Sequence, residues 1–369
     1  MRVTSYDKNL VSCDLRLVAY MFEDFLNNKN TWLNGTGPSA DIIFSSRIRL
    51  ARNLSEFPFP SRAAPKQRED ILNKIREVLR KIKLLKKAVF ILMEDLTDLD
   101  RQFLLERHLV SQEHIVSFKG KGLIVSNEEN IALMINEEDH LRIQVMTSGF
   151  NLKLCWEFID EIDNELSKSL DFAFSPSLGY LTSCPTNVGT ALRSSCMLHL
   201  PALVLTKRLN KVLELLAKIS FTTRGLFGEG TQALGDFFQI SNQVSLGLSE
   251  AELIDNLCGV VNQVKEQEMD ARNSLLKRHK INLEDNVWRS LGILRNSRLV
   301  SSKEALSHLS MLSLGLDLGI INNIKREEVN SLFVIIQPAH LQKIENRVLK
   351  EEERDYIRAQ VLRAKLNSV

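Results

Sequence analysis

The change in hydrophobic periodicity between the two halves of this chain is the feature that most constrains its fold. Between residues 41 and about 150, short apolar runs are bounded by turn or charged residues and separated by helical stretches. From residue 249 onward nearly all signals are helical, and no proline occurs between Pro201 and Pro338. The pattern predicts the α+β class, with a sheet region first and an all-helical region after it. The candidate strands are residues 41–44, 88–93, 122–126, 131–135 and 141–147.

Helix starts and amphipathic spacing support this division. Ser249 and Glu252 form a capping box before apolar residues at helical spacing, and Ser301 and Glu304 form another. Residues 65–87 carry an apolar stripe, with nine Lys or Arg residues mostly on the other face. That basic face is either an ordinary solvated surface or a docking surface for phosphate or acidic partners.

The chain divides on this pattern into three parts. Residues 1–40 are polar and irregular and end in a turn-rich run, which predicts a poorly packed lead-in. Residues 41–270 form the mixed domain and residues 271–369 the helical one. The boundary is expected within the polar stretch 265–280.

Composition excludes several classes of protein. The 369 residues include 48 Lys and Arg and 46 Asp and Glu, a formal net charge of +2, so the basic excess typical of nucleic-acid binding is absent. Apolar residues make up 44% of the chain, yet no run approaches the roughly 18 residues that cross a membrane. We therefore expect a soluble protein with no nucleic-acid or membrane partner.

Cysteine usage and the amino terminus both indicate the cytoplasm. Asp7, Asp14 and Arg16 interrupt any apolar stretch that a secretory signal would need. The five cysteines are scattered with no CxxC spacing, which fits neither a disulfide framework nor a zinc site. We expect a reducing cytoplasm and no protein-bound metal.

Two segments carry charged residues that a packed core does not require. Arg47 and Arg49 follow the first apolar run, and strand alternation would put both guanidinium groups on one face. They either form surface ion pairs or hold a polyanion between them. Residues 136–142 (NEEDHLR) follow another apolar run, and they form either an exposed acidic hairpin or a group of carboxylates with a chemical role.

Two further segments combine glycine with reactive or charged residues. Cys184 opens the CPTNVGT loop of residues 184–190, and Arg193 follows shortly after. A lone cysteine is usually a small buried hydrophobe, but this electropositive setting favours a thiolate. Residues 224–231 hold three glycines together with Arg224 and Glu229, so they form either a mobile functional loop or a plain surface loop.

Together the four segments suit phosphoryl transfer to a cationic acceptor. Arginines bind triphosphate oxygens bidentately. A loose transition state requires positioning and charge neutralisation rather than covalent help. The carboxylates then serve the acceptor.

The four segments, in this order, resemble the catalytic core of the guanidino kinases, or phosphagen kinases, over roughly residues 41–270. The resemblance implies a largely antiparallel sheet flanked by helices. The chain lacks the small helical domain that precedes the core in arginine and creatine kinases and carries a helical tail instead, so it is most similar to the bacterial protein-arginine kinases. Residues 354–359 (RDYIRA) match the RDxxRA phosphoarginine-recognition motif of that family's carboxy-terminal domain.

The resemblance assigns the phosphates of ATP to five arginines and the rest of the nucleotide to the segments around them. His108 matches a nucleotide-contacting histidine of the family only locally, and a histidine on a surface helix is the alternative. The five arginines are Arg47, Arg49, Arg142, Arg193 and Arg224. The further ATP-binding residues are Ser45, Ser46, Ile48, Ser194, Ser195, Cys196, Met197, Gly225, Leu226, Phe227 and Gly228.

The resemblance also implies how the acceptor is held. Glu138 and Glu229 match two carboxylates that grip the substrate guanidinium, and Cys184 matches the cysteine beside it. A guanidinium has a pKa above about 12 and is a poor nucleophile until it loses a proton, so we expect Glu138 to be the principal base. A Cys184 thiolate would add negative charge without forming a phosphocysteine.

ATP and Mg²⁺ are the expected cofactors. Mg²⁺ should bridge the phosphates, with Glu137 and Asp139 near its water shell at most. Loop 224–231 should close over ATP to exclude water. Gln232 stands where an acidic residue is common in the family, which could alter loop closure or product release without removing activity.

The implied function is ATP-dependent phosphorylation of arginine side chains in proteins, which marks those proteins for degradation by a Clp chaperone-protease. A kinase of free guanidines and a non-catalytic phosphoarginine-binding adaptor are the alternatives. The resemblance further implies a zinc-binding activator protein and self-association as a homodimer.

The carboxy-terminal motif has two interpretations. Arg354 and Arg358 are four residues apart, so on a helix they would project from one face with Asp355 adjacent. They form either surface salt bridges with neighbours such as Glu351 or an allosteric phosphoarginine site. In the second case the arginines bind the phosphate and Asp355 the guanidinium.

Overall fold

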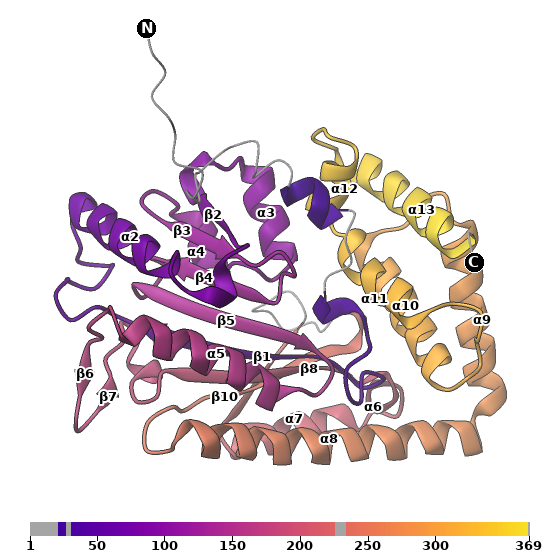
Figure 1. Cartoon of the computed structure of the whole chain (residues 1–369). Helices are drawn as coiled ribbons and strands as arrows, with labels where there is room; N and C mark the ends of the chain where they lie inside the picture. Colours follow the sequence, from indigo (N-terminus) through magenta and orange to yellow (C-terminus); the bar gives the residue numbers. More distant parts are fainter. Residues whose placement is uncertain (1–20, 27–30, 226–233, 368–369) are drawn as a thin grey trace, which may run out of the picture.

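The computed structural model describes residues 21–26, 31–225 and 234–367. At its centre lies an eight-stranded antiparallel sheet in the order β2-β3-β4-β5-β1-β8-β10-β9 (Figure 1). Its long central strand is β1 (Ile43–Arg52), and a separate two-stranded hairpin is formed by β6 (Phe174–Ser175) and β7 (Gly179–Tyr180). The other strands are β2 (Val89–Leu92), β3 (Gly122–Val125), β4 (Ile131–Ile135), β5 (Leu141–Ser148), β8 (Leu192–His199), β9 (Phe221–Arg224) and β10 (Phe237–Asn242).

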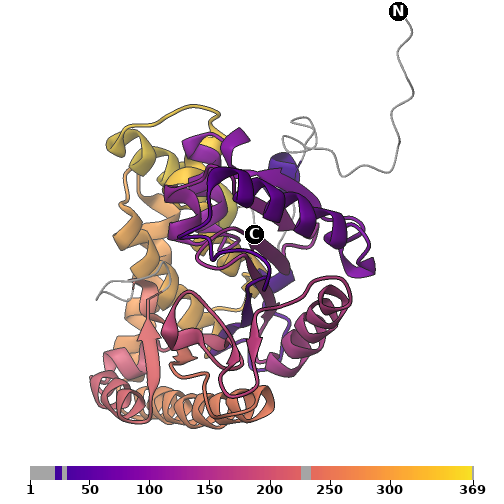
Figure 2. The ribbon, with the colours of Figure 1, turned by 90° about the vertical axis from the view of Figure 1, so that its left-hand side faces the viewer.

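Helices cover the sheet and then form the C-terminal region, which gathers on one side of it (Figures 1 and 2). The expected antiparallel sheet flanked by helices and the all-helical region after it are confirmed. In the described part of the chain no helix is both long and apolar enough to span a membrane. The helices are α2 (Pro65–Leu79), α3 (Asp98–Glu106), α4 (Gln112–Val116), α5 (Leu152–Ser167), α6 (Pro201–Leu205), α7 (Leu209–Lys218), α8 (Glu250–Arg278), α9 (Lys280–Asn296), α10 (Ser302–Asp317), α11 (Arg326–Ile335), α12 (Pro338–Ile344) and α13 (Glu351–Asn367).

Strand alternation builds two core layers on opposite faces of the sheet. In β2, Phe90 packs in the same cluster as Ile71 of α2, whereas the next residue, Ile91, packs in the same cluster as Phe103 of α3. Every residue of β3 and β4 is buried, because helices cover both faces. This explains why these strands appear in the sequence as continuous apolar runs.

The helix predicted over residues 65–87 is shorter in the structure. α2 ends at Leu79, and a short 3-10 turn, η2 (Lys83–Leu85), precedes β2. Ile82 and Leu85 are still buried in the same core. The apolar spacing is therefore satisfied by a turn that returns the chain to the sheet.

α8 crosses the predicted boundary between the two domains. It runs unbroken from Glu250 to Arg278, starting at the predicted Ser249–Glu252 capping box, and His279 separates it from α9. The division at residue 270 therefore stays a prediction, with α8 lying along one edge of the molecule (Figure 1).

The segment before residue 41 is better packed than predicted. In its described part, Met21, Phe22 and Phe25 are buried in the cluster around Phe103. Trp32 is only 2% exposed and makes edge contacts with Phe44 and His108. The expectation of a poorly packed lead-in is therefore wrong for residues 21–26 and 31–33, because aromatic side chains anchor this polar segment.

A buried polar network joins the sheet region to the C-terminal helices. The Glu106 carboxylate, at the end of α3, accepts the backbone N–H groups of Ala339 (2.8 Å) and His340 (3.0 Å) at the start of α12. The Nδ1 of His340 lies 2.7 Å from Glu106, and its Nε2 lies 3.2 Å from Arg107, which pairs with Glu129. These bonds fix α12 against α3.

Candidate active site

Two cavities lie along the sheet and share four of their lining residues. The larger one has a volume of about 630 Å³ and the smaller one about 310 Å³. The shared residues are Arg49, Glu113, Arg142 and Arg224. The wall between the two cavities is therefore strongly cationic, with a single carboxylate among its shared side chains.

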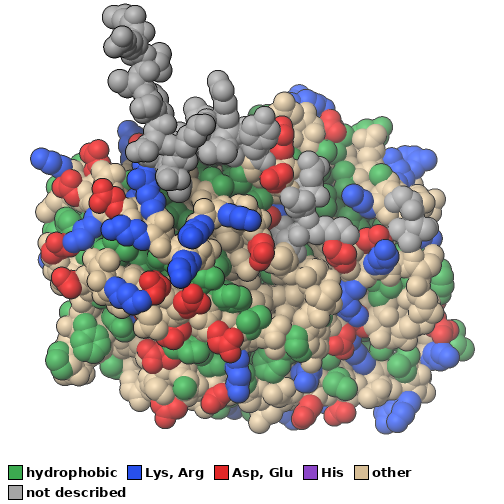
Figure 3. All heavy atoms as spheres, in the orientation of Figure 1, with side chains coloured by type: hydrophobic (Ala, Val, Ile, Leu, Met, Phe, Trp, Pro, Cys, Tyr) green, Lys and Arg blue, Asp and Glu red, His purple; other side chains and the backbone are tan. Residues whose placement is uncertain are grey.

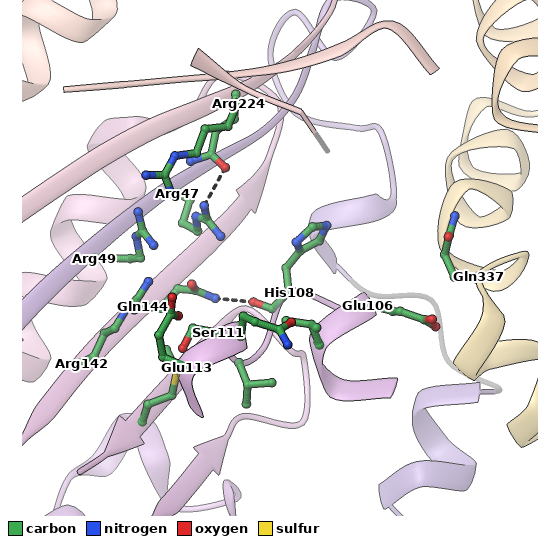
Figure 4. Close-up of a pocket in the computed structure, with 15 residues that line it drawn as sticks. Arg47, Arg49, Glu106, His108, Ser111, Glu113, Arg142, Gln144, Arg224 and Gln337 are labelled. Atoms are coloured by element: carbon green, nitrogen blue, oxygen red, sulfur yellow. Dashed lines mark hydrogen bonds between the residues drawn. The ribbon is translucent and has the colours of Figure 1, made fainter. Parts of the chain in front are cut away.

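The predicted pair Arg47 and Arg49 lies on one face of β1 and lines the larger cavity (Figure 4). The Arg47 guanidinium donates to Gln239 Oε1 of β10 at 2.8 Å. Arg49 stands opposite Arg193 of β8 in the strand register. The local prediction that alternation would place both arginines together is confirmed.

The arginines lie close enough together for their positive charges to lower one another's pKa. Burial, followed by the charges of Arg142, Arg193 and Arg224, lowers the pKa of Arg47 to about 9. Burial and the same kind of repulsion hold the pKa of Arg49 well below its usual range, and its Nε atom is buried without a hydrogen-bond partner in the described structure. Such a cluster is stabilised by a polyanion whose oxygens take the unused donors.

Glu137 fixes one of these arginines. Its carboxylate pairs with Arg142 at 2.5 Å and accepts a hydrogen bond from Ser111. Burial raises the pKa of Glu137, but the contact with Arg142 outweighs this effect. The pKa of Glu137 is therefore lowered to about 2. Glu137 therefore holds Arg142 in place as a permanent anion.

Asp139 joins the acidic segment to the cysteine loop. It is buried, and its Oδ1 accepts hydrogen bonds from Asn53 (2.6 Å) and from the backbone N–H of Ser183 (2.7 Å). The hydroxyl of Ser183 donates to the backbone carbonyl of Glu138 at 2.7 Å. Asp139, like Glu137, is therefore engaged by protein groups, and both carboxylates have a positioning role.

Glu138 and Cys184, which come from segments far apart in the chain, both line the smaller cavity. Glu138 is exposed, and partial burial, followed by the charges of Asp139 and Glu137, raises the pKa of its carboxyl. The sulfur of Cys184 lies 3.0 Å from the hydroxyl of Thr186. Residues 136–142 are thus more than an exposed acidic hairpin, since their accessible carboxylate lines the same cavity as a thiol.

Arg193 and Arg224 complete the arginine group. Arg193 lines the smaller cavity and donates to Thr222 (3.0 Å) and Ser241 (3.2 Å), while Arg224 lines both cavities. Gly225 is described and lines neither cavity, and the rest of the glycine loop, from residue 226 onward, lies outside the described residues. The predictions that fall there concern Leu226, Phe227, Gly228, Glu229 and Gln232.

His108 lines the larger cavity and does not lie on a surface helix. It follows α3 in the left-handed conformation, with φ of 58°, and its backbone carbonyl accepts from Gln144 at 2.7 Å. Burial and then the charge of Arg47 lower the pKa of His108 to about 3. A neutral imidazole therefore forms part of the wall.

The remaining residues predicted to bind ATP divide into two groups. Ser45, Ser195 and Met197 line a small recess beside the larger cavity, together with Arg47 and His108. The side chains in the other group are buried in the interior of the sheet and line neither cavity, and ATP binding by these residues stays a prediction. They are Ser46, Ile48, Ser194 and Cys196.

Several residues that line the cavities were not predicted from the sequence. Gln144 could have been found, because it lies two residues after Arg142 on the same strand face. Glu113 of α4 and Gln239 of β10 belong to no motif. Glu106 and Gln337 form the far wall of the larger cavity (Figure 4), and Gln337 comes from the C-terminal helical region.

The carboxy-terminal motif is only partly exposed. Arg358 is 1% exposed, and its guanidinium donates to the backbone carbonyls of Ile336 (3.0 Å) and Val300 (2.9 Å) and pairs with Asp355. The prediction that Arg354 and Arg358 project together from an exposed face is therefore wrong for Arg358. Phosphoarginine binding by Arg354, Asp355 and Arg358 stays a prediction, and of the three Arg354 and Asp355 are partly exposed.

The lowered pKa of the buried His114, on α4, gives a testable pH dependence of stability. It is fully buried, its Nε2 lies 3.1 Å from the Gly122 carbonyl, and burial followed by the charge of Lys121 lowers the pKa of its imidazole to about 3. In the unfolded chain a histidine has a pKa of about 6.5, so as the pH falls the unfolded chain binds a proton on His114 before the folded protein does. The free energy of unfolding therefore decreases as the pH falls from about 6.5 toward 3. In His114→Gln, we expect the drop in unfolding free energy between about pH 6 and pH 4 to be smaller by about 2 kcal/mol.

Urea denaturation at the two pH values measures this difference. The substitution of the exposed His279 by glutamine is the matched control. If the free energy of unfolding drops equally in His114→Gln and in the parent chain, the folded protein protonates His114 as readily as the unfolded chain does, which would contradict the lowered pKa.

An antiparallel sheet with an arginine-lined cavity, separated by a shared cationic wall from a second cavity lined by a carboxylate and a thiol, is the arrangement expected of a phosphotransferase. The sequence matches the family model for the ATP:guanido phosphotransferase C-terminal catalytic domain over residues 70–271. Residues 280–369 match the model for the protein-arginine kinase McsB C-terminal domain.

Curated relatives cover nearly the whole chain. It is 46% identical over 346 residues to the protein-arginine kinase of Halothermothrix orenii, spanning 94% of this chain and 99% of that protein. It is 44% identical over 351 residues to that of Desulforamulus reducens, spanning 94% and 98%. The chain therefore belongs to the protein-arginine kinase family, and it is an enzyme.

Solved structures agree with this placement at the level of the guanidino-kinase fold. The duplicated taurocyamine kinase from Schistosoma mansoni, with bound transition state analog components, aligns with a TM-score of 0.58 and 28% identity over 66% of this chain and 35% of that one. A lombricine kinase aligns with a TM-score of 0.56 and 25% identity over 64% of this chain and 68% of that one.

Proposed function

We propose that this protein transfers the γ-phosphoryl group of ATP to the guanidinium groups of arginine side chains in proteins. The observation that carries the proposal is the sharing of Arg49, Arg142 and Arg224 between the two cavities. A triphosphate in the larger cavity would end at these arginines, and a guanidinium in the smaller one would approach from the side of Glu138 and Cys184. Both reactants would then meet at a cationic wall that neutralises the transferred group.

Glu138 is proposed as the base. Its carboxylate is accessible in the smaller cavity and its pKa is raised, which favours acceptance of a proton from a guanidinium that loses its charge as it attacks. Glu229, from the resemblance, is the proposed second carboxylate. Two carboxylates would hold the planar guanidinium in one orientation and aim one nitrogen at phosphorus.

Mg²⁺ is proposed to accompany the nucleotide. The described residues contain no group of three or more potential metal ligands, so the ion would be held mainly by phosphate oxygens, as Mg²⁺ commonly is. Glu113, which lines both cavities, is the residue that fits a water-mediated contact. Bound there, Mg²⁺ would neutralise phosphate charge.

Cys184→Ala is expected to lower the rate about 10- to 100-fold, less than loss of the base, because a thiolate would polarise the guanidinium without forming a bond to it. Steady-state kinetics with a protein substrate measures the effect, and Cys258→Ala is a control on a distant helix. Trapping a phosphorylated Cys184 in a single turnover would contradict direct transfer.

Membership of the family supports further proposals about the cell. These are a cytoplasmic location, a zinc-binding activator protein, a homodimer, and delivery of the marked proteins to a Clp chaperone-protease. Incubation with labelled ATP and either a protein or free arginine, read as acid-labile phosphate, tests the activity. Labelling of free arginine alone would indicate a free-guanidine kinase, and labelling of neither would indicate a phosphoarginine-binding adaptor.

A further inference from the structure

The loop that carries Cys184 is held between two protruding segments. On one side the backbone N–H of Tyr180, in hairpin β6–β7, donates to the carbonyl of Gly189 at 2.8 Å. On the other side the hydroxyl of Ser245 donates to the carbonyls of Thr186 (3.2 Å) and Val188 (3.0 Å). The cysteine loop, the hairpin and residues 243–249 therefore form one unit at the smaller cavity.

Glycine makes this close packing possible. Gly189 has φ of +115°, and a side-chain carbon there would lie 2.4 Å from the carbonyl oxygen of Ser245. Gly179, with φ of +77°, would bring such an atom to 2.5 Å from the carbonyl oxygen of Gly189. The backbones of the three segments touch, so their outer side chains share one surface.

Five exposed side chains of the hairpin and of the segment after β10 are apolar. Two side chains of the hairpin and three of the segment after β10 are large, hydrophobic and exposed, and hydrophobic side chains are visible over the hairpin at the lower left in Figure 3. We call these five side chains the apolar rim. They are Phe174 (58% exposed), Leu178 (46%), Val244 (48%), Leu246 (48%) and Leu248 (39%).

The base of the rim is rigid. The Arg52 guanidinium lies 3.5 Å from the ring centroid of Tyr180, is paired with Asp163 at 2.7 Å, and donates to the carbonyl of Thr190 at 3.1 Å. The ring of Phe174 packs edge-on against Tyr180, with centroids 5.3 Å apart. The exposed side chains are thus displayed on a fixed support beside the cavity that contains Glu138 and Cys184.

We propose that the apolar rim binds hydrophobic side chains that flank the target arginine in a polypeptide substrate. A free guanidino compound that carries charged ammonium and carboxylate groups would gain nothing from five apolar side chains outside the cavity, on segments that contact the loop carrying its lining residue Thr186. A protein-borne arginine inserted into the smaller cavity would necessarily place its neighbouring residues against its mouth. The inference rests on the proposed function and adds a sequence preference to it.

Two fluorescent peptides test the proposal, one with leucine and phenylalanine beside its single arginine and one with serine at the same positions. Their binding is measured by polarisation, and their phosphorylation as kcat/KM. The parent chain should prefer the apolar peptide by about tenfold, which corresponds to about 1.4 kcal/mol and is within what the burial of one such side chain provides. Phe174→Ser combined with Leu246→Ser should lose this preference while its kcat/KM for the serine peptide stays within about twofold.

The control combines Ile281→Ser with Trp288→Ser, two exposed apolar residues of α9. It should retain the preference. Equal binding of both peptides by the parent chain, or an equal loss for both peptides in the rim variant, would overturn the proposal. Peptide preference in binding without any phosphorylation would leave the rim in place and contradict the proposed function instead.

Discussion

Glu138→Gln is expected to lower arginine phosphorylation by at least about two to three orders of magnitude while ATP binding stays nearly unchanged. The substitution removes the negative charge and the proton acceptor together but preserves shape. ATP binding should survive because Glu138 lines only the smaller cavity, whereas Arg47 and His108 line the larger one. Single-turnover kinetics gives the chemical rate, and calorimetric titration of a non-hydrolysable ATP analogue gives the affinity.

The control is Glu94→Gln, an exposed carboxylate in a short turn after β2. It should keep full activity. A rate within a few-fold of the parent chain in Glu138→Gln would remove this residue from the mechanism. A large loss of ATP affinity would mean instead that the two cavities act as one binding site.

Arg358→Ala is expected to destabilise the protein by about 3 kcal/mol. The substitution would leave the buried carbonyls of Ile336 and Val300 without their donor and Asp355 without its partner. Arg354→Ala, on the partly exposed side of α13, should change the unfolding free energy by less than about 0.5 kcal/mol. Urea denaturation at pH 7 compares the two variants directly.

The same comparison decides how phosphoarginine binding can be tested. If Arg358 is structural, only Arg354→Ala reports on recognition, because a variant that also lacks Arg358 loses affinity through unfolding. Similar unfolding free energies for both variants would instead mean that the contacts of Arg358 contribute little to stability.

Features set by local geometry could be predicted from the sequence. Alternation with a period of two placed Arg47 and Arg49 in one cavity, and the same rule applied to Arg142 would have found Gln144. The continuous apolar runs of β3 and β4 were sufficient to indicate buried strands. These patterns depend only on neighbours within a few residues.

Features set by contacts between distant segments could not be predicted. Glu137 and Glu138 are adjacent residues of one type, yet only the contact of Glu137 with Arg142 and Ser111 makes it a buried anion. Helical spacing gave the face on which Arg358 lies, but not the carbonyls that cover it. Trp32 is likewise buried by partners whose positions the surrounding polar sequence does not reveal.

If nucleotide binds in the larger cavity as proposed, the far wall of that cavity makes nucleotide affinity and the position of the C-terminal helices a single linked equilibrium. Glu106 and Gln337 both line that cavity, and Glu106 holds the first N–H groups of α12. A ligand that shifts α12 away from α3 therefore changes nucleotide affinity by some factor, and bound nucleotide changes the affinity for that ligand by the same factor. The helical region would in this sense be thermodynamically part of the proposed nucleotide site, although its residues match a separate family model.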